Sequence, residues 1–227
     1  MIEMKCSKFA SFICAAALAL LVLSFSIAVP ILFRPFYYLQ IDSLHLPERT
    51  GWSKEVIREA YDQVLDFCVL GELFGTGQLA WSESGQSHFA DVRELFLLDF
   101  RILGFSALVC ILLLVLYKTG RLSFHRFLGR GPGFWAGVLA AALVLVVGGL
   151  AALDFERAFV VFHALFFPGK DNWLFDPATD QIILVMPEEF FRNCAILIGV
   201  VLLVCCAALV ISDLAGRRHP KSISRGG

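Results

Sequence analysis

The first long stretch of the chain, "FASFICAAALALLVLSFSIAVPILF" at residues 9–33, contains no charged side chain. A helix needs about 20 apolar residues to cross the hydrocarbon core of a bilayer, so this stretch predicts a membrane span. It exceeds the apolar segment of a secretion signal, about 7 to 15 residues, and no clear small-residue cleavage site follows it. We therefore expect residues 9–33 to be retained as a transmembrane anchor.

The rest of the chain has the same apolar character. Hydrophobic residues make up 58% of the 227 and charged residues only 17%, which is unlike an ordinary soluble domain. Three more runs are long enough to span a bilayer, namely 97–117, 134–153 and 194–212. We predict an all-α membrane protein, a four-transmembrane-helix bundle that forms a single integral membrane domain over residues 1–227.

The basic residues predict the orientation of these spans. Three segments hold ten Lys and Arg against two acidic residues, and these are 1–8, 118–133 and 213–227. The remaining polar segments hold nine basic against eighteen acidic residues. The positive-inside rule therefore places both termini in the cytoplasm and the loops 34–96 and 154–193 outside, in a multi-pass protein of the cell (cytoplasmic) membrane. The basic inner rim suits anionic lipid headgroups and not nucleic acid.

The outer loops are long enough to form a small extracytoplasmic cap of short helix and strand segments. Alternating side chains at Tyr38–His45 and in "QIILVM" at 181–186 predict extended segments. Ser53 is the expected N-cap of a helix, and Ser87 that of a second helix leading into the second span. Pro187 suits the first turn of the last helix, where Glu188 and Glu189 complement the helix dipole. Loops of this length are usually functional, so we expect any active site on the extracytoplasmic face.

The seven cysteines do not form a dithiol motif, because no C-x-x-C is present. Cys68 lies in an outer loop and Cys194 lies near the outer membrane surface, so a bridge between them is open but not favoured. We expect most of the cysteines to be small buried hydrophobes.

Two outer histidines are the candidates for chemistry. His88 and Asp91 lie three residues apart on an expected helix, so the carboxylate shares a face with the ring. His163 shares a face with Phe159, Phe166 and Phe167. The competing interpretation is structural: an interfacial histidine bound to a carbonyl, beside phenylalanines that pack against lipid. Ionisable residues at membrane depth favour a functional role.

Other chemistries lack their motifs. The chain has no H-E-x-x-H, no calcium-binding D-x-D-x-D-G and no G-x-S-x-G elbow. We therefore expect no metal and no soluble cofactor, and a serine nucleophile has only weak support.

The order of these pieces resembles a known family. "HFADV" at residues 88–92 precedes the second span, and F-H-x-x-F-F…W-x-F-D-P…D…P-E-x-F-F runs from Phe162 to Phe191 between the third and fourth. Together they resemble the lipoprotein intramolecular transacylases, called Lit, over nearly the whole chain. Gly85, in "WSESGQSH", departs from the more helical run of that family, and we interpret it as loosening the approach to His88.

The resemblance implies an activity and a substrate. Such enzymes move the sn-2 acyl chain of a diacylglyceryl-modified lipoprotein to the α-amino group of its N-terminal cysteine and leave a lyso-form lipoprotein. The motif histidines correspond to His88 and His163 here. We hypothesise that His88 is the base and is oriented by Asp91, and that His163 polarises the ester or carries the acyl group. The expected substrate-binding residues are Asp171, Trp173, Phe166 and Phe167, and the expected partners are lipoproteins and membrane lipids.

The sequence leaves two other functions open at this point. The same histidines could serve a membrane lipid hydrolase or acyltransferase that acts on phospholipid. A non-enzymatic scaffold is the other, and it predicts that both histidines are replaceable.

Overall fold

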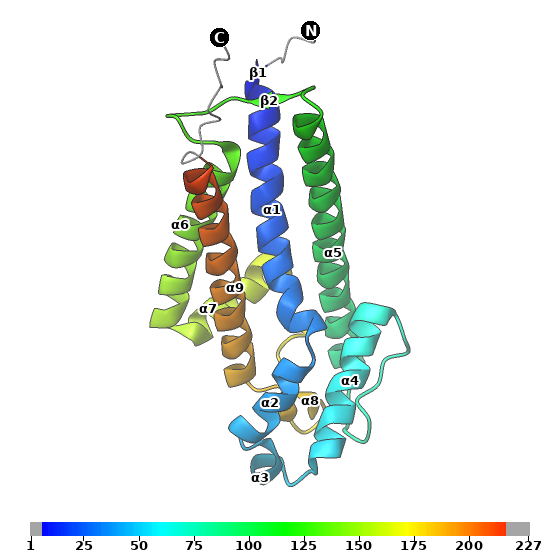
Figure 1. Ribbon diagram of the computed structural model, residues 1–227. Helices are drawn as coiled ribbons and strands as arrows, with labels where there is room; N and C mark the ends of the chain where they lie inside the picture. The colour runs from blue at the N-terminus through cyan, green and yellow to red at the C-terminus, as the bar shows by residue number, and fades with distance from the viewer. Residues whose placement is uncertain (1–5, 217–227) are drawn as a thin grey trace, which may run out of the picture. The chain divides into compact units, whose positions relative to one another are not determined.

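The computed structural model describes residues 6–216; residues 1–5 and 217–227, the ends of the predicted cytoplasmic segments, lie outside the described residues. Eleven elements follow one another along this part of the chain (Figure 1). In order they are β1 (Cys6–Ser7), α1 (Lys8–Leu32), α2 (Pro35–Ser43), α3 (Leu46–Thr50), α4 (Lys54–Leu70), α5 (Glu83–Lys118), β2 (Ser123–Phe124), α6 (Pro132–Leu153), α7 (Phe155–Phe166), α8 (Ile182–Val185) and α9 (Glu188–Ala215).

Four helices, α1, α5, α6 and α9, are long and apolar enough to cross a membrane. They cover the four predicted spans, so the predicted fold class, an all-α membrane protein, is confirmed. At 36 residues, α5 is about 54 Å long and exceeds the hydrocarbon core of about 30 Å. Its first turns, residues 83–96, precede the apolar stretch and carry the polar residues of the motif.

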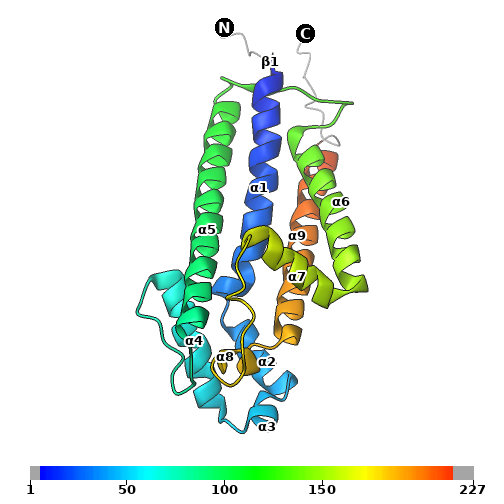
Figure 2. The same cartoon turned by 180° about the vertical axis from the view of Figure 1, so that it is seen from behind.

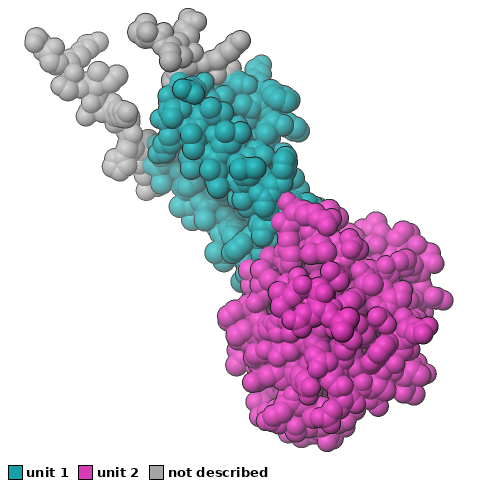
Figure 3. Space-filling model, turned by 90° about the vertical axis from the view of Figure 1, so that its right-hand side faces the viewer, with its two compact units in different colours: residues 1–25, 102–146, 200–227 teal, residues 26–101, 147–199 magenta. Residues whose placement is uncertain are grey.

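The chain divides into two compact units (Figure 3), and each of the four long helices contributes to both. The first unit comprises residues 1–25, 102–146 and 200–227. Its core joins Val22 of α1 to Leu202 and Cys206 of α9, with small residues of α6 packed against them. A Cβ atom at Gly137 of α6 would lie 2.8 Å from the Cys206 carbonyl oxygen, so α6 and α9 approach each other closely there.

The second unit comprises residues 26–101 and 147–199 and contains both candidate histidines. Helices α2, α3, α4 and α8 pack together in it, as Figures 1 and 2 show from opposite sides. The ring of Tyr37 stacks on Tyr61 with centroids 3.7 Å apart. Its hydroxyl donates to the Val185 carbonyl at 2.7 Å. The buried hydroxyl is therefore satisfied, and it ties α8 to the core.

The strand segments predicted in the outer loops are wrong. Residues 38–43 lie in α2 and the "QIILVM" stretch contains α8. Tyr37, Gln40 and Ile41 are the buried residues of α2, at helical spacings of three and four. Ile182 and Val185 are likewise three apart. Over residues 6–216 the strands are β1 and β2, which pair in parallel in segments predicted to be cytoplasmic.

The predicted helix starts hold at one position and fail at another. Ser53 caps α4, since its side chain accepts from the Val56 N–H at 3.4 Å. The cap at Ser87 is wrong, because α5 begins at Glu83 and Ser82 Oγ accepts from the Gly85 N–H at 3.0 Å. The first turn of α9 contains the two expected glutamates. Cys68 and Cys194 are free, so the bridge between them is not formed.

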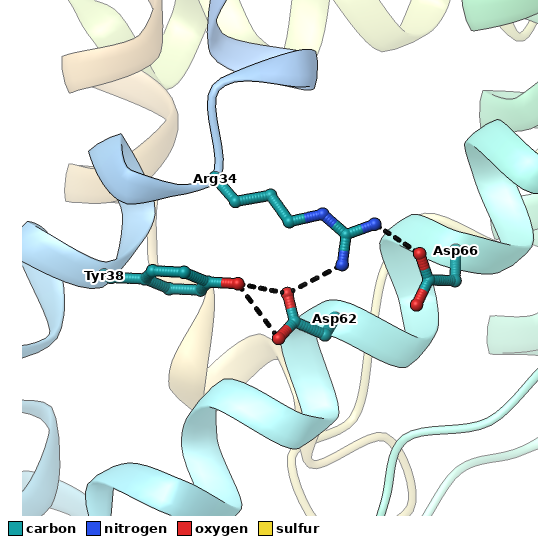
Figure 4. A network of polar contacts seen from close by, with 4 residues as sticks. All are labelled: Arg34, Tyr38, Asp62 and Asp66. Atoms are coloured by element: carbon teal, nitrogen blue, oxygen red, sulfur yellow. Dashed lines mark hydrogen bonds and ion pairs between the residues drawn. The ribbon is translucent and has the colours of Figure 1, made fainter.

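A polar cluster fastens the start of α2 to α4 within the second unit (Figure 4). One guanidinium nitrogen of Arg34 lies 3.0 Å from Asp62 Oδ1, and the other pairs with Asp66. The Tyr38 hydroxyl donates to Asp62 at 2.8 Å. Less than a third of each charged side chain is exposed. Because these charges are partly withdrawn from water, each depends on its partner more than a surface pair would.

Replacing Arg34 with Met is expected to lower the free energy of unfolding by about 1 to 3 kcal/mol, because two half-buried carboxylates lose their cation. Thermal unfolding in detergent would measure this. Arg49→Met is the matched control. Arg49 pairs with Glu189 at 3.5 Å through side chains that are 47% and 38% exposed, so this variant should change stability little. Equal losses of stability in the two variants would show that the Arg34 cluster stabilises the fold no more than the Arg49 pair does.

Candidate active site

The structure brings His88 of α5 and His163 of α7 together inside the second unit. Their ring centroids are 5.7 Å apart and the ring planes differ by 34°. Both side chains are buried, with exposed fractions of 6% and 5%. Two imidazoles predicted as a pair from motifs 75 residues apart therefore meet in one site.

The first turn of α5 is fixed by a buried carboxylate. Asp180 Oδ1 accepts from the Ser82 backbone N–H at 2.8 Å and from the Ser82 hydroxyl at 2.9 Å. A Cβ atom at Gly85 would overlap with that same oxygen. Gly85 therefore does not loosen the approach to His88; it allows Asp180 to hold the helix start one turn before His88.

Helix α7 presents His163 with a defined tautomer. Asp154 caps the helix by accepting from the Arg157 N–H at 2.9 Å. The Nδ1 atom of His163 lies 2.7 Å from the Phe159 carbonyl oxygen. A carbonyl oxygen only accepts, so Nδ1 carries the hydrogen in the neutral ring and Nε2 keeps its lone pair.

Aromatic rings form the walls of the site. Phe167 contacts both imidazoles, with centroid distances of 5.1 Å to His88 and 5.6 Å to His163. Trp173 stacks on His163 at 4.4 Å with an interplanar angle of 24°. Phe175 meets His88 edge-on at 5.4 Å. These apolar walls withhold solvation from any charge that forms on either ring.

Burial keeps both imidazoles neutral near pH 7. It lowers the pKa of His88 to about 4, helped by repulsion from His163 and partly offset by Asp91 and Asn172. Burial also lowers the pKa of His163, and its bond to the Phe159 carbonyl opposes this. A neutral imidazole offers a lone pair for accepting a proton or attacking a carbonyl carbon.

Asp91 does not make the direct contact with His88 that the sequence predicted. Its oxygens accept from Lys170 Nζ at 2.5 Å and from Asn172 Nδ2 at 3.1 Å. Burial raises the pKa of Asp91, but these two donors outweigh it and hold that pKa below its usual value. Asp91 therefore acts on His88 through its charge and through Asn172.

The predicted substrate-binding residues occupy different surroundings. Phe167 and Trp173 contact the histidines, whereas Phe166 is half exposed and packs on Phe162 at 4.7 Å. Asp171 is exposed, and its backbone carbonyl accepts from the Leu174 N–H at 3.0 Å. Sequence reasoning missed Lys170, Asn172 and Asp180. The first two lie in the polar "GKDNW" turn at residues 169–173, and no local pattern shows what they contact.

The donor set does not favour a metal. Across residues 6–216, no three His, Cys, Asp or Glu side chains gather as metal ligands would. The two imidazoles lie instead among aromatic carbon atoms.

The lowered histidine pKa predicts a loss of stability in acid. An unfolded imidazole binds a proton below about pH 6.5, whereas folded His88 does so only below about pH 4. The unfolded state thus binds more protons in this window, and the free energy of unfolding falls as pH drops through it. His88→Gln should remove up to about 2 kcal/mol of that fall. Thermal unfolding in detergent at pH 7, 6 and 5 would measure the difference, with the exposed His45→Gln as control. Parallel curves for wild type and His88→Gln would contradict it.

Comparison with known proteins gives consistent results. The family described as lipoprotein intramolecular transacylase Lit matches residues 12–191. Solved structures of the membrane integral lipoprotein intramolecular transacylase Lit from Bacillus cereus are similar to this fold. One has a TM-score of 0.81 at 23% identity and covers 92% of this chain and 96% of its own. Two variants of that protein, with a histidine replaced by arginine or alanine, give TM-scores of 0.75 and 0.74 at the same identity, over 92% of this chain and 92% and 94% of theirs. No curated protein matches the chain in sequence.

Proposed function

The chain belongs to the lipoprotein intramolecular transacylase family, and on that premise we propose that it performs one particular acyl transfer. The sn-2 acyl chain of a diacylglyceryl-modified lipoprotein moves to the α-amino group of the lipoprotein's N-terminal cysteine. The product carries an N-acyl chain and a monoacylglyceryl group. The observation that supports this best is the pair of buried, neutral imidazoles 5.7 Å apart.

An α-amino group needs a base before it can complete an attack on an ester. Its pKa is about 8, so part of it is neutral near pH 7 and its nitrogen can bond to the ester carbonyl carbon. That nitrogen must then lose a proton, and the bond between the carbonyl carbon and the sn-2 oxygen must break. A neutral imidazole accepts the proton and returns it to the departing oxygen. Atoms and charge balance without water or a cofactor, because amine and ester belong to one molecule.

The surroundings of His163 favour it as this base, which reverses the roles hypothesised from sequence. Its Nε2 lone pair is available because Nδ1 is held by Phe159. When Nε2 takes a proton, the cation lies against the face of Trp173, whose ring attracts positive charge. Burial and repulsion from His163 hold the pKa of His88 at about 4, so His88 is a poor proton acceptor near pH 7. It is then the second imidazole and acts on the ester carbonyl.

The apolar surface of α7 supplies a place for the acyl chains. Phe162, Leu165 and Phe166 are exposed on this helix, next to the turn that carries His163. In a bilayer such side chains lie among lipid tails, where the substrate's own chains reside. The proposal therefore includes a substrate that enters from the lipid at the extracytoplasmic face of the cytoplasmic membrane. We assign the exposed Asp171 of this loop to contact with the polar head of the lipoprotein.

Mass spectrometry of one lipoprotein's N-terminal peptide tests the proposal. Cells lacking native N-acylation would express this protein, or no addition, and the peptide would be fragmented to locate each acyl chain. Transfer within one molecule predicts an unchanged number of acyl chains, with one relocated to the amine.

Three results separate the alternatives. A peptide that has lost one acyl chain, with free fatty acid released, would indicate a lipid hydrolase. A peptide with an added third chain would indicate an acyltransferase that uses another lipid. Unmodified diacylglyceryl peptide, with the protein shown to be folded in the membrane, would support a scaffold.

A further inference from the structure

Two polar atoms in the site formed by His88 and His163 are buried without a hydrogen-bond partner. They are Nδ1 of His88 and Oδ1 of Asn172. Leaving a donor or acceptor unpaired in an apolar site destabilises the folded protein, so such atoms call for an explanation. One of them is a possible donor and the other is an acceptor.

Asn172 lies against the helical turn that carries His88. Its Nδ2 atom donates to Asp91 Oδ2 at 3.1 Å and approaches Ser87 Oγ at 3.4 Å. Ser87 immediately precedes His88 in α5, and Asp91 follows it by three residues. The amide therefore spans the same face of α5 as the imidazole.

The orientation of this amide is decided by Asp91. A carboxylate accepts hydrogen bonds, so the NH₂ end of Asn172 must face it and the carbonyl end must face away. Lys170 Nζ, at 2.5 Å from Asp91 Oδ1, keeps that carboxylate charged and in place. The amide thus has one sensible orientation, and its oxygen is left for His88.

We propose that Asn172 is a positioning residue whose carbonyl oxygen accepts the Nδ1 hydrogen of His88, so that Nε2 of His88 carries a lone pair. This rests on the proposed function only for its catalytic consequence. Both histidines then have the same tautomer, with His163 held by the Phe159 carbonyl. Asn172 also raises the pKa of His88, as an acceptor that faces the ring does.

The tautomer decides what His88 can do. With Nδ1 protonated, the neutral ring has no hydrogen on Nε2 to donate to the ester carbonyl oxygen. His88 therefore acts as a proton acceptor, or as a nucleophile whose Nε2 bonds to the ester carbon and later passes the acyl group to the amine. In the second case the α-ammonium first gives a proton to Nε2 of His163, which passes it to the departing sn-2 oxygen. The freed amine then attacks the acyl-imidazole and gives its next proton to His163, and His88 leaves as the neutral ring. No other reactant is needed.

The test reads the tautomer directly. Protein labelled with ¹⁵N-histidine in detergent micelles would be examined by NMR, and the His88 signals assigned by their absence in His88→Gln. In the wild type, Nδ1 of His88 should appear protonated and Nε2 unprotonated. In Asn172→Leu the ring should shift toward the Nε2-protonated form, which free histidine favours in water.

The rate of acyl transfer gives a second test, with a matched control variant. Asn172→Leu should lower kcat about tenfold to a hundredfold, because the lone pair of His88 moves from Nε2 to Nδ1. KM should change less than about twofold. Asn193→Leu removes another amide bond of the same unit, from Asn193 Nδ2 to Gln40 Oε1 at 2.7 Å, and should leave kcat and the His88 spectrum unchanged. Asn172→Asp keeps an acceptor for the Nδ1 hydrogen but loses the amide donor to Asp91, so the tautomer should be restored while kcat recovers only in part.

The charge of Asn172→Asp gives a pH signature that reports how close residue 172 lies to the His88 ring. The groups facing His88 are His163 and Phe167 around α7, Asp91 on its own helix, and Lys170 and Phe175 from the following loop. A carboxylate added there raises the His88 pKa, so the ring is protonated at higher pH. The acid limb of the rate profile should therefore move to higher pH.

Two outcomes would overturn the inference. One is a wild-type spectrum with Nε2 of His88 protonated, and the other is an unchanged spectrum and kcat in Asn172→Leu. Neither depends on the nature of the substrate, because NMR reports the tautomer even where no acyl transfer is detected. An absence of transfer in the wild type would contradict the proposed function alone.

Discussion

Replacing His163 with glutamine is expected to lower the rate of acyl transfer by about a hundredfold to ten thousandfold, the usual contribution of a general base. Glutamine retains a polar side chain but accepts no proton near pH 7, so the attacking nitrogen keeps its charge and collapses back to the amine. His88→Gln should lose activity on a similar scale. The measurement is single-turnover conversion of a diacylglyceryl peptide in detergent, with the relocated chain located by fragmentation.

The control for this prediction is another histidine of the same unit. His45 is exposed at the start of α3 and has no place in the site. His45→Gln makes the same chemical change and should retain full activity. Turnover within tenfold of the wild type in either His88→Gln or His163→Gln would end the two-histidine proposal.

A single added methyl group at Gly85 is the second large effect that we expect. Alanine normally stabilises a helix by about 0.5 to 1 kcal/mol relative to glycine. At Gly85 its Cβ atom would overlap with Asp180 Oδ1, which holds the Ser82 cap. Gly85→Ala should therefore lower the free energy of unfolding by about 1 to 3 kcal/mol. Displacement of the helix start should also cut transfer about a hundredfold, because His88 is one turn away.

Gly104→Ala is the matched substitution in the same helix. Nothing lies within 4 Å of a Cβ atom built there, so the variant should be as stable as the wild type or slightly more so. Thermal unfolding and the transfer rate would be measured for both. A Gly85→Ala protein with the stability and rate of Gly104→Ala would show that the Asp180 contact does not set the position of His88.

The fold class followed from the sequence because hydropathy acts over continuous stretches. A run such as 194–212 needs no knowledge of the rest of the chain, and all four spans were found this way. The short outer elements were harder. In α2 the apolar residues Tyr37 and Ile41 fit a helix, but over so few residues an alternating pattern fits almost as well.

The two histidines of the site could be predicted from the sequence, but the residues that position them could not. His88 and His163 stand out because their motifs flank two spans. Asp180 and Asn172 act on residues more than 80 positions away, and no local spacing encodes such contacts. Asp91 illustrates the difference. It shares a helical face with His88, as the spacing implied, yet Lys170 and Asn172 compete for its oxygens.

The stacking of Trp173 on His163 gives the protein an optical reporter. A protonated imidazole quenches the fluorescence of an adjacent indole by accepting an electron from its excited state, whereas the neutral ring quenches it far less. The chain has four tryptophans, so a protein that keeps Trp173 and has phenylalanine at the other three positions would emit from this contact alone. Its brightness would follow the charge of His163 during a turnover, and a stopped-flow trace would time the arrival and departure of the proton.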